Sequence, residues 1–413
     1  MEREGLKIDW TSIILWGLFV LLGWLNIYAA TSLNAGPDAF IFDISYDFGK
    51  QLFWIAIAGI LGFIVLILDN RLVEISSYVL YGAGILLLIL VLLIGKEVNG
   101  SKSWLTLGPL RLQPSEFMKL FTAMAVAKFM SRFNFSFKSW TNRLGVASLI
   151  GLPTLLVVLQ KDTGTALVFM SFIFMLLREG LNPLYFILFS LVIVFSVMAL
   201  IIHKLLVITI IAFLAWLSYF FAFRSRYKII HLILAASLSG VVLSVDYIVN
   251  HILRPHQRNR IIALFNPEID PLGLNWNTTQ SKIAIGSGGF WGKGFLNGNR
   301  TKYHFVPQQA TDFIFCTVGE EYGWVGSVLL LVLFFAFLAQ ILFLAENARS
   351  TYARVFGYSI ASIFFFHIAV NIAMTIGLAP VIGIPLPFFS YGGSSLISFT
   401  LMLFVLLNFY ANR

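Results

Sequence analysis

The chain has 413 residues, of which 59% are hydrophobic and only 11% are charged. This composition excludes an ordinary soluble protein, because a soluble chain of this length needs more charge to cover its surface. The single cysteine, Cys316, excludes an intrachain disulfide and a thiolate-rich metal site.

Apolar segments long enough to cross a bilayer recur along the whole chain. The first has no small-residue cleavage site, so we expect an uncleaved span rather than a signal peptide. The sequence predicts an all-α, polytopic integral membrane protein of about twelve helices, forming a single domain over residues 1–413. The expected spans are 11–30, 51–69, 73–95, 114–130, 143–160, 163–178, 183–202, 204–223, 228–250, 311–343, 354–378 and 388–411.

Lys and Arg in short loops determine how such a chain is oriented. The short loops that lie inside when both termini are cytoplasmic are the more basic ones, with Arg132 and Lys138 in one loop and Arg224 and Arg226 in another. We leave out the long loop 251–310, because long loops translocate largely regardless of charge. Both termini are therefore expected in the cytoplasm and this loop outside. The net charge of +9 then requires no nucleic-acid partner.

The long outer loop 251–310 is rich in Gly, and its basic residues outnumber its acids, Glu268 and Asp270. Within it, Ser281–Gly286 is expected to form a short amphipathic helical turn. Such a surface suits an anionic substrate such as a lipid-linked phosphate, although contact with lipid headgroups alone fits equally well. The basic residues are Arg254, Arg258, Arg260, Lys282, Lys293, Arg300 and Lys302.

Asp312 stands at the start of the expected span 311–343. An ionisable group inside a span is costly and is therefore a functional candidate. At about 100° per residue, Asp312 shares one helix face with Cys316, Gly319, Gly323 and Gly326. Small residues permit close helix packing, so we expect Asp312 to point into the bundle rather than toward lipid. The structural alternative is a cap, in which the side chain of Thr311 or Asp312 accepts the free N–H groups of the helix start.

Three further acidic residues lie in or beside the expected spans. Glu320 and Glu321 are interpreted as buried, hydrogen-bonded groups rather than catalytic ones. Asp162 stands in a short outer turn, where a helix cap is the structural interpretation. The alternative is that Asp162 supplies the second carboxylate that a metal site or an acid–base pair with Asp312 would need.

Glu116 and Lys119 lie at i,i+3 spacing, which allows them to pair on one face of a helix. A structural ion pair and a role facing the substrate fit these two residues equally well. Trp104 is interpreted as an interfacial anchor, a common position for Trp in membrane proteins. The break 383–395 is rich in Pro, Gly and Ser, and irregular backbone at this depth is tolerated where it lines a cavity.

Several short motifs follow one another in chain order. They are Ser103-Trp104-Leu105, Gln113-Pro114-Ser115-Glu116 with Lys119, Asp162-Thr163-Gly164-Thr165, Arg258 and Arg260, Asn266-Pro267-Glu268, Asp270-Pro271-Leu272-Gly273, Gln280-Ser281-Lys282 through Gly289, Gly292-Lys293-Gly294, Thr311-Asp312-Phe313-Ile314-Phe315 with Gly319-Glu320-Glu321, and Pro385-Leu386-Pro387 through Ser394. As a set they resemble the SEDS family (shape, elongation, division and sporulation), and its elongation branch more than its division branch. The family usually has ten spans, so two extra helices are expected between residues 179 and 250.

The resemblance implies a peptidoglycan glycosyltransferase that polymerises lipid II at the outer face of the bacterial cytoplasmic membrane, for cell elongation and rod shape. It implies a class B penicillin-binding protein as partner, which supplies the transpeptidase and activates the polymerase, within the elongation machinery. It also implies that Asp312 is the catalytic residue and ties Trp104, Glu116, Lys119 and Asp162 to activity.

The expected mechanism has Asp312 as general base on the 4-hydroxyl of the acceptor sugar, with undecaprenyl pyrophosphate leaving the donor. Lys119, Arg258, Arg260 or a divalent metal such as Mg²⁺ or Mn²⁺ would neutralise the pyrophosphate. The need for a metal stays open, with Asp312 and Asp162 as candidate ligands.

Two rival functions are a flippase that moves lipid II across the membrane and a non-catalytic scaffold of a cell-wall complex. A flippase needs access from both faces, whereas the polar features of this sequence cluster outside. The residues expected to bind the substrate or to support the catalytic group are Trp104, Glu116, Lys119, Asp162, Arg258, Arg260, Lys282, Lys293 and Ser394.

Overall fold

The computed structural model describes residues 8–32, 40–98, 100–107, 110–221, 225–247, 276–303 and 305–411. Arg258 and Arg260 of the expected substrate-binding set therefore lie outside the described residues. The chain divides into two compact units, one of Met1–Gly180 with Asn277–Arg413 and one of Leu181–Trp276. The organisation of all 413 residues as a single domain stays a prediction.

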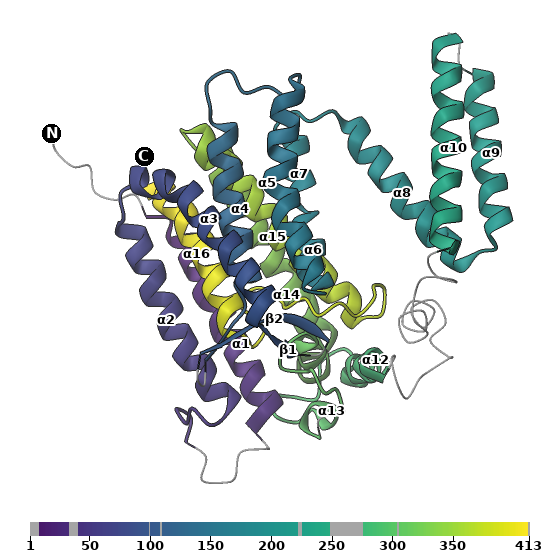
Figure 1. Cartoon of the computed structure of the whole chain (residues 1–413). Coiled ribbons are helices and arrows are strands. Elements are labelled where there is room, and N and C mark those ends of the chain that lie inside the picture. Colours follow the sequence, from purple (N-terminus) through teal and green to yellow (C-terminus); the bar gives the residue numbers. More distant parts are fainter. Residues whose placement is uncertain are drawn as a thin grey trace. The chain divides into compact units, whose positions relative to one another are not determined.

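Helices dominate both units (Figure 1). The second unit holds α8 (Pro183–Ile201), α9 (Lys204–Phe221) and α10 (Ser225–Tyr247), and these three helices occupy the region in which the sequence predicts extra helices. The helices of the first unit are α1 (Trp10–Thr31), α2 (Asp47–Ile67), α3 (Asn70–Ile94), α4 (Pro114–Met130), α5 (Trp140–Leu159), α6 (Thr163–Phe169), α7 (Phe172–Arg178), α12 (Trp276–Gly288, in this unit from Asn277), α13 (Asn299–Lys302), α14 (Ile314–Glu346), α15 (Thr351–Thr375) and α16 (Gly393–Ala411).

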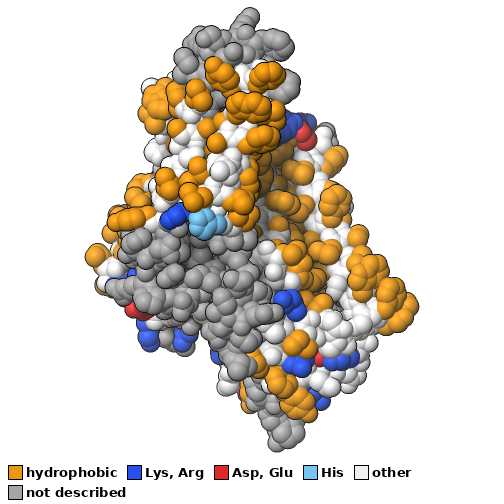
Figure 2. Space-filling model, turned by 90° about the vertical axis from the view of Figure 1, so that its right-hand side faces the viewer, with side chains coloured by type: hydrophobic (Ala, Val, Ile, Leu, Met, Phe, Trp, Pro, Cys, Tyr) orange, Lys and Arg blue, Asp and Glu red, His pale blue; other side chains and the backbone are white. Residues whose placement is uncertain are grey.

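The helical membrane fold predicted from hydropathy is confirmed. Within the part of the chain that the structure describes, seven helices are long and apolar enough to cross a membrane, namely α1, α2, α3, α5, α14, α15 and α16. Shorter apolar helices cover Thr163–Arg178, Pro183–Ala199, Lys204–Phe220 and Leu232–Val245. The expected span 114–130 is the helix α4, which carries Glu116, Lys119 and Lys128. On the face shown in Figure 2, hydrophobic side chains cover the helices, as contact with lipid requires.

The sequence analysis did not predict a small antiparallel sheet between α3 and α4. Its strands are β1 (Lys96–Val98), β2 (Ser101–Leu107) and β3 (Leu110–Leu112), in the order β1-β2-β3. Trp104 lies in the central strand, where it pairs with Lys96. The sheet is tied to the turn before α6 by a hydrogen bond from the Lys102 N–H to the Gln160 carbonyl at 2.9 Å.

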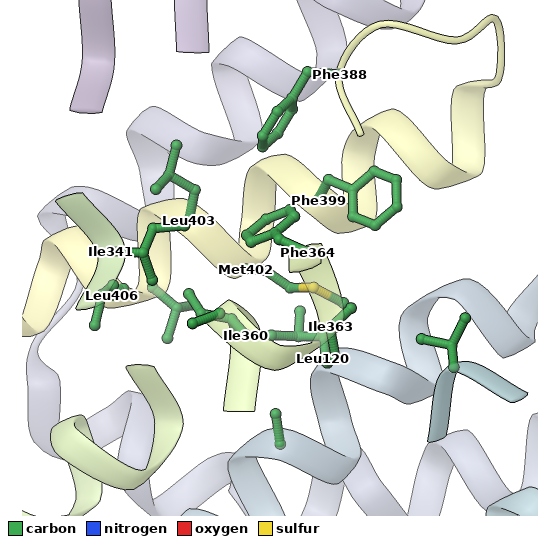
Figure 3. Close-up of a cluster of buried hydrophobic side chains, with 14 of the residues drawn as sticks. Leu120, Ile341, Ile360, Ile363, Phe364, Phe388, Phe399, Met402, Leu403 and Leu406 are labelled. Carbon is green, nitrogen blue, oxygen red and sulfur yellow. The ribbon is translucent and has the colours of Figure 1, made fainter. Parts of the chain in front are cut away.

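The core of the first unit lies between α4, α14, α15 and α16. Leu120, Ile341, Phe364 and Met402, one from each of these helices, are all at most 3% exposed and lie in one cluster (Figure 3). In the most apolar stretches of α15 and α16, 72% and 83% of the residues are buried, against 17% for α5. Both α15 and α16 are therefore enclosed mostly by protein rather than lipid.

The helix α14 is interrupted at Gly323, whose backbone is non-helical (φ 64°, ψ −156°). The section after the break, residues 324–346, rises about 34 Å, which is enough to cross the hydrocarbon core. The section before the break, which begins at Ile314, is therefore a separate helical segment. The prediction of one continuous helix, with Asp312 on the face of Gly323, is therefore wrong.

A glycine-rich loop fills the break in α14. The freed N–H groups of Trp324 and Val325 donate to the carbonyls of Gly289 and Phe290 at 2.9 and 3.2 Å. In the other direction, Lys293 and Gly294 donate N–H groups to the Glu320 and Glu321 carbonyls at 3.1 and 2.9 Å. Such pairing is needed, because unsatisfied backbone groups at membrane depth are very costly.

The close approach at the break explains why glycine stands in the loop. Gly292 has a positive φ of 82°, and a Cβ atom there would lie 2.1 Å from the Glu321 carbonyl oxygen. The Gly-Lys-Gly motif thus has a direct structural role, independent of any contact with a substrate.

Candidate active site

Asp312 lies in the turn before α14 and does not cap the helix. The helix begins after Phe313, and no side chain donates or accepts a capping hydrogen bond there. The Thr311 hydroxyl instead bonds to Gln308. The Asp312 side chain is partly buried, and among the described residues no hydrogen bond reaches its carboxylate. Burial raises the pKa of Asp312 to about 6. The capping interpretation is therefore wrong for Asp312, and its carboxylate remains available for chemistry.

The backbone around Asp312 is fixed by two neighbouring segments. The carbonyl oxygens of residues 310–312 accept, in order, the Tyr391 N–H at 2.9 Å, the Ser390 hydroxyl at 2.6 Å and the Asn371 amide at 2.8 Å. Tyr391 and Ser390 belong to the irregular segment between α15 and α16, and Asn371 belongs to α15 itself. The turn that carries Asp312 is thus held by α15 and by the segment that joins α15 to α16.

Asp162 ends one helix and begins the next. The N–H groups of Lys161 and Asp162 bond back to the carbonyls of Val158 and Val157 at 2.9 and 3.2 Å, which forms a Schellman turn after α5. Lys161 occupies the position where glycine is usual, with φ 60°. Asp162 then caps α6, because its carboxylate accepts the Thr165 N–H at 3.1 Å.

The Asp162 carboxylate also joins α6 to the start of α4. It accepts hydrogen bonds from the Thr165 hydroxyl at 3.0 Å, the Gln113 amide at 2.8 Å and the Ser115 hydroxyl at 3.4 Å. The structural interpretation of Asp162 as a cap is therefore confirmed. Because it accepts hydrogen bonds from these three residues, this carboxylate links α6 to the start of α4.

Both aspartates lie against one short segment. A Cβ atom on Gly164 would lie 2.2 Å from the Ile382 carbonyl, and one on Gly383 would lie 3.4 Å from Asp312 Oδ2. The two acids are thus at the same end of the first unit. Among the described residues, however, no group of three or more His, Cys, Asp and Glu side chains could hold a metal. The described residues around Asp312 and Asp162 therefore do not form a metal site with three such ligands.

Ser394 connects the same elements from the side of α16. Its hydroxyl accepts the Gln113 N–H at 3.1 Å and lies 3.5 Å from the Arg111 carbonyl. Since the Gln113 side chain donates to Asp162, Ser394 and Asp162 hold opposite sides of one residue. Trp104 is half-buried in β2, the strand that bonds to Gln160 beside the Asp162 turn.

Glu116 and Lys119 form the predicted ion pair. Lys119 Nζ lies 2.9 Å from both oxygens of Glu116 and 2.9 Å from His367 Nε2, and its side chain is fully buried. His367 donates Nδ1–H to the Pro385 carbonyl at 3.0 Å, which leaves Nε2 to accept from Lys119. The ammonium group of Lys119 is therefore fully engaged. This arrangement favours a structural pair over direct contact with a phosphate.

The remaining expected cations differ in their surroundings. Lys282 is exposed on α12, near the end of α15 at Gly377. Lys293 donates to the buried carboxylate of Glu320 at 2.8 Å. Glu320 and Glu321 are at most 1% exposed, so their interpretation as buried, hydrogen-bonded groups is confirmed.

Sequence reasoning missed His367 and Asn371, which link Lys119 and Asp312 to the segment after α15. Both are polar residues within the apolar span 354–378, and a polar residue inside a span is the signal that marks such positions.

These features define a multi-pass membrane protein whose polar site lies at one end of its helices. A family model described as "Cell cycle protein", the family of FtsW, RodA and SpoVE, matches residues 9–230 and 204–413. The chain belongs to this family, and the resemblance to the SEDS proteins is confirmed. The two matched ranges overlap at residues 204–230, within the second unit.

The relatives include proteins of the elongation branch. The chain is 32% identical over 390 residues to the peptidoglycan glycosyltransferase RodA of Treponema pallidum, covering 86% of this chain and 87% of the relative. It is 35% identical over 319 residues to the peptidoglycan glycosyltransferase MrdB of Escherichia coli K12, covering 77% and 73%. It is 32% identical over 414 residues to the stage V sporulation protein E of Bacillus subtilis, covering 99% and 98%.

Solved structures show the same fold. One is a chain of a peptidoglycan synthase complex that coordinates polymerization and crosslinking, with a TM-score of 0.69 and 28% identity over 98% of this chain and 99% of that one. Another is the rod shape determining protein RodA of Thermus thermophilus, with a TM-score of 0.61 and 27% identity over 97% of this chain and 96% of that one. The polytopic fold is thus RodA-like.

Proposed function

We propose that this chain is a peptidoglycan glycosyltransferase that polymerises lipid II at the outer face of the cytoplasmic membrane during cell elongation. Relatives that align with most of the chain are named peptidoglycan glycosyltransferases. The observation that carries the proposal is Asp312, a partly buried carboxylate that receives no hydrogen bond from the described residues and stands where the turn before α14 meets α15 and the segment between α15 and α16.

In the proposed reaction, Asp312 takes the proton of the 4-hydroxyl of the acceptor sugar. The oxygen attacks the anomeric carbon of the donor, the bond from that carbon to the phosphate oxygen breaks, and undecaprenyl pyrophosphate leaves with the electron pair. The raised pKa makes Asp312 a stronger base than an ordinary aspartate. Arg258, Arg260 and the exposed Lys282 are the proposed partners of the pyrophosphate.

The remaining expected residues are proposed to support this site from the same end of the fold. Asp162, Ser394 and Trp104 belong to the elements that surround the start of α4, and the buried pair of Glu116 and Lys119 anchors that helix to α15. Lys293, through Glu320, holds the loop that fills the break in α14.

The proposed setting is the bacterial cytoplasmic membrane with both termini in the cytoplasm. A structural neighbour is part of a complex that coordinates polymerization and crosslinking. This supports a class B penicillin-binding protein as the partner that supplies the transpeptidase and activates the polymerase, within the elongation machinery.

Product analysis on labelled lipid II tests the proposed function against a flippase. The chain is purified with a class B penicillin-binding protein whose transpeptidase is inactivated, and the product lengths are compared with those of each protein alone. We expect glycan chains from the pair. If labelled lipid II moves between leaflets of proteoliposomes but no polymer forms, the chain is a flippase instead.

The pKa of Asp312 predicts the pH range of activity. A general base must be ionised, so kcat/KM is expected to fall as the pH drops through about 6, where half of the activity remains. The measurement is the initial rate of lipid II consumption by the pair on both sides of this pH. An acidic limb near the ordinary aspartate value of 3.8 would show that the base does not have the raised pKa that burial gives to Asp312.

A further inference from the structure

We propose that Asn371 is the positioning residue that fixes the Asp312 turn against the segment after α15. The inference rests on the proposed function, since a positioning residue needs a reaction to serve. Asn371 is fully buried on α15, and its amide donates to the Asp312 carbonyl at 2.8 Å and to the Ile384 carbonyl at 2.7 Å. One side chain thus joins two segments that are distant in sequence.

Both segments bound by Asn371 border the carboxylate. Asp312 carries it, and Gly383, next to Ile384, lies beside Oδ2 with a positive φ of 71°. A small shift of either segment changes the distance between the base and any group bound there. Misplacement by about 1 Å is enough to lower a rate by about 100-fold.

The helix that carries Asn371 is a rigid support. His367, Asn371 and Thr375 follow one another at i,i+4 spacing, so they lie on one face. His367 donates to the Pro385 carbonyl, and the Thr375 carbonyl accepts the Ser281 hydroxyl at 2.8 Å. The same face therefore holds the segment after α15 on one turn and α12 on another, with Asn371 between them.

Asn371 contacts its neighbours through the donors of its side-chain amide and not through its carbonyl oxygen. Its Oδ1 is buried and finds no hydrogen-bond partner among the described residues, whereas its amide group donates two hydrogen bonds. A buried acceptor without a partner is unfavourable. The unpaired Oδ1 therefore makes asparagine unfavourable at this buried position. What asparagine contributes there is two N–H donors that bond both segments.

Asn408 on α16 provides a matched control. It is equally buried, and its amide donates to the carbonyls of Val65, Leu66 and Leu68 at 3.0, 3.1 and 2.6 Å. These carbonyls lie at the end of α2 that leads into α3, away from the Asp312 turn. Asn408→Leu removes the same chemistry without touching the proposed site.

The experiment compares Asn371→Leu and Asn408→Leu in the complex with the partner protein, with Asn371→Asp as a second variant of unchanged size. We expect kcat for lipid II polymerisation to fall about 100-fold in both Asn371 variants with KM little changed. Asn408→Leu is expected to keep the wild-type kcat even if it unfolds at a lower temperature. A variant that only weakens the fold would not produce this difference.

Amide hydrogen exchange of residues 308–313 and 382–391 tests, independently of the reaction, whether Asn371 holds these two segments in place. Exchange there is expected to be faster in Asn371→Leu than in the wild type, and unchanged in Asn408→Leu. If the wild-type complex makes no polymer but exchange is still faster in Asn371→Leu, the proposed function fails, whereas the positioning of the two segments by Asn371 is supported. Unchanged exchange, or a wild-type kcat in both Asn371 variants, overturns the role of Asn371.

Discussion

Replacing Asp312 by Asn is expected to lower the polymerisation of lipid II at least about 100-fold, the range that a general base contributes. The amide has nearly the same shape but cannot take the proton of the acceptor hydroxyl. The measurement is kcat/KM for labelled lipid II with the partner protein present. An Asn variant that polymerises at the wild-type rate would remove Asp312 from the mechanism.

The loss of activity in Asp312→Asn is expected without a loss of stability. Since burial raises the pKa of Asp312, the stability that this group contributes is complete below its ordinary pKa of 3.8 and is lost as the pH rises through about 6. At neutral pH the variant removes a disfavoured charge, so it should unfold at the wild-type temperature or above. Asp43→Asn is a control for activity, since Asp43 lies in the loop before α2, where its carboxylate accepts the Ser45 N–H at 2.8 Å.

Replacing Glu320 by Ala is expected to destabilise the protein by about 1–3 kcal/mol, because several donors lose the buried carboxylate that accepts their hydrogen bonds. The Glu320 carboxylate is fully buried and accepts from Lys293 Nζ at 2.8 Å, the Arg300 N–H at 2.9 Å, and the N–H and hydroxyl of Thr301 at 2.8 Å each. All of these donors lose their acceptor at once. Thermal unfolding in detergent measures the effect.

Glu346→Ala is the matched control for Glu320→Ala. Glu346 pairs with Arg178 at 2.5 Å, but the two side chains are 50% and 53% exposed. Exposed pairs contribute little, so this variant should unfold close to the wild-type temperature. If Glu320→Ala and Glu346→Ala unfold at the same temperature, the loop that fills the α14 break is not held by Glu320.

The helices could be predicted because lipid imposes a simple rule on length and polarity. The pair of Glu116 and Lys119 could be predicted because i,i+3 spacing alone brings the two groups together. The cap at Asp162 followed from its place in a short turn. All of these features depend on neighbours in sequence, and the structure reproduces them.

The features that sequence reasoning missed depend on distant segments. From its sequence context, Gly323 is expected to be a small residue inside a helix. In the structure the helix breaks at Gly323, where the next two N–H groups bond to the carbonyls of residues 289 and 290. That break invalidated the helix-face argument for Asp312, although the residue still lies against protein. Asn371 is important for its hydrogen bonds to the Ile384 and Asp312 carbonyls, and no local sequence pattern connects these residues.

The most direct test of a polymerase with Asp312 as its base uses proteoliposomes in which lipid II lies only in the leaflet next to the Asp312 end of the chain. Glycan-chain formation is measured for the wild-type complex and for Asp312→Asn. We expect polymer from the wild type and none from the variant. Polymer that forms only when lipid II lies in the opposite leaflet, or that forms equally in Asp312→Asn, would contradict the proposed site.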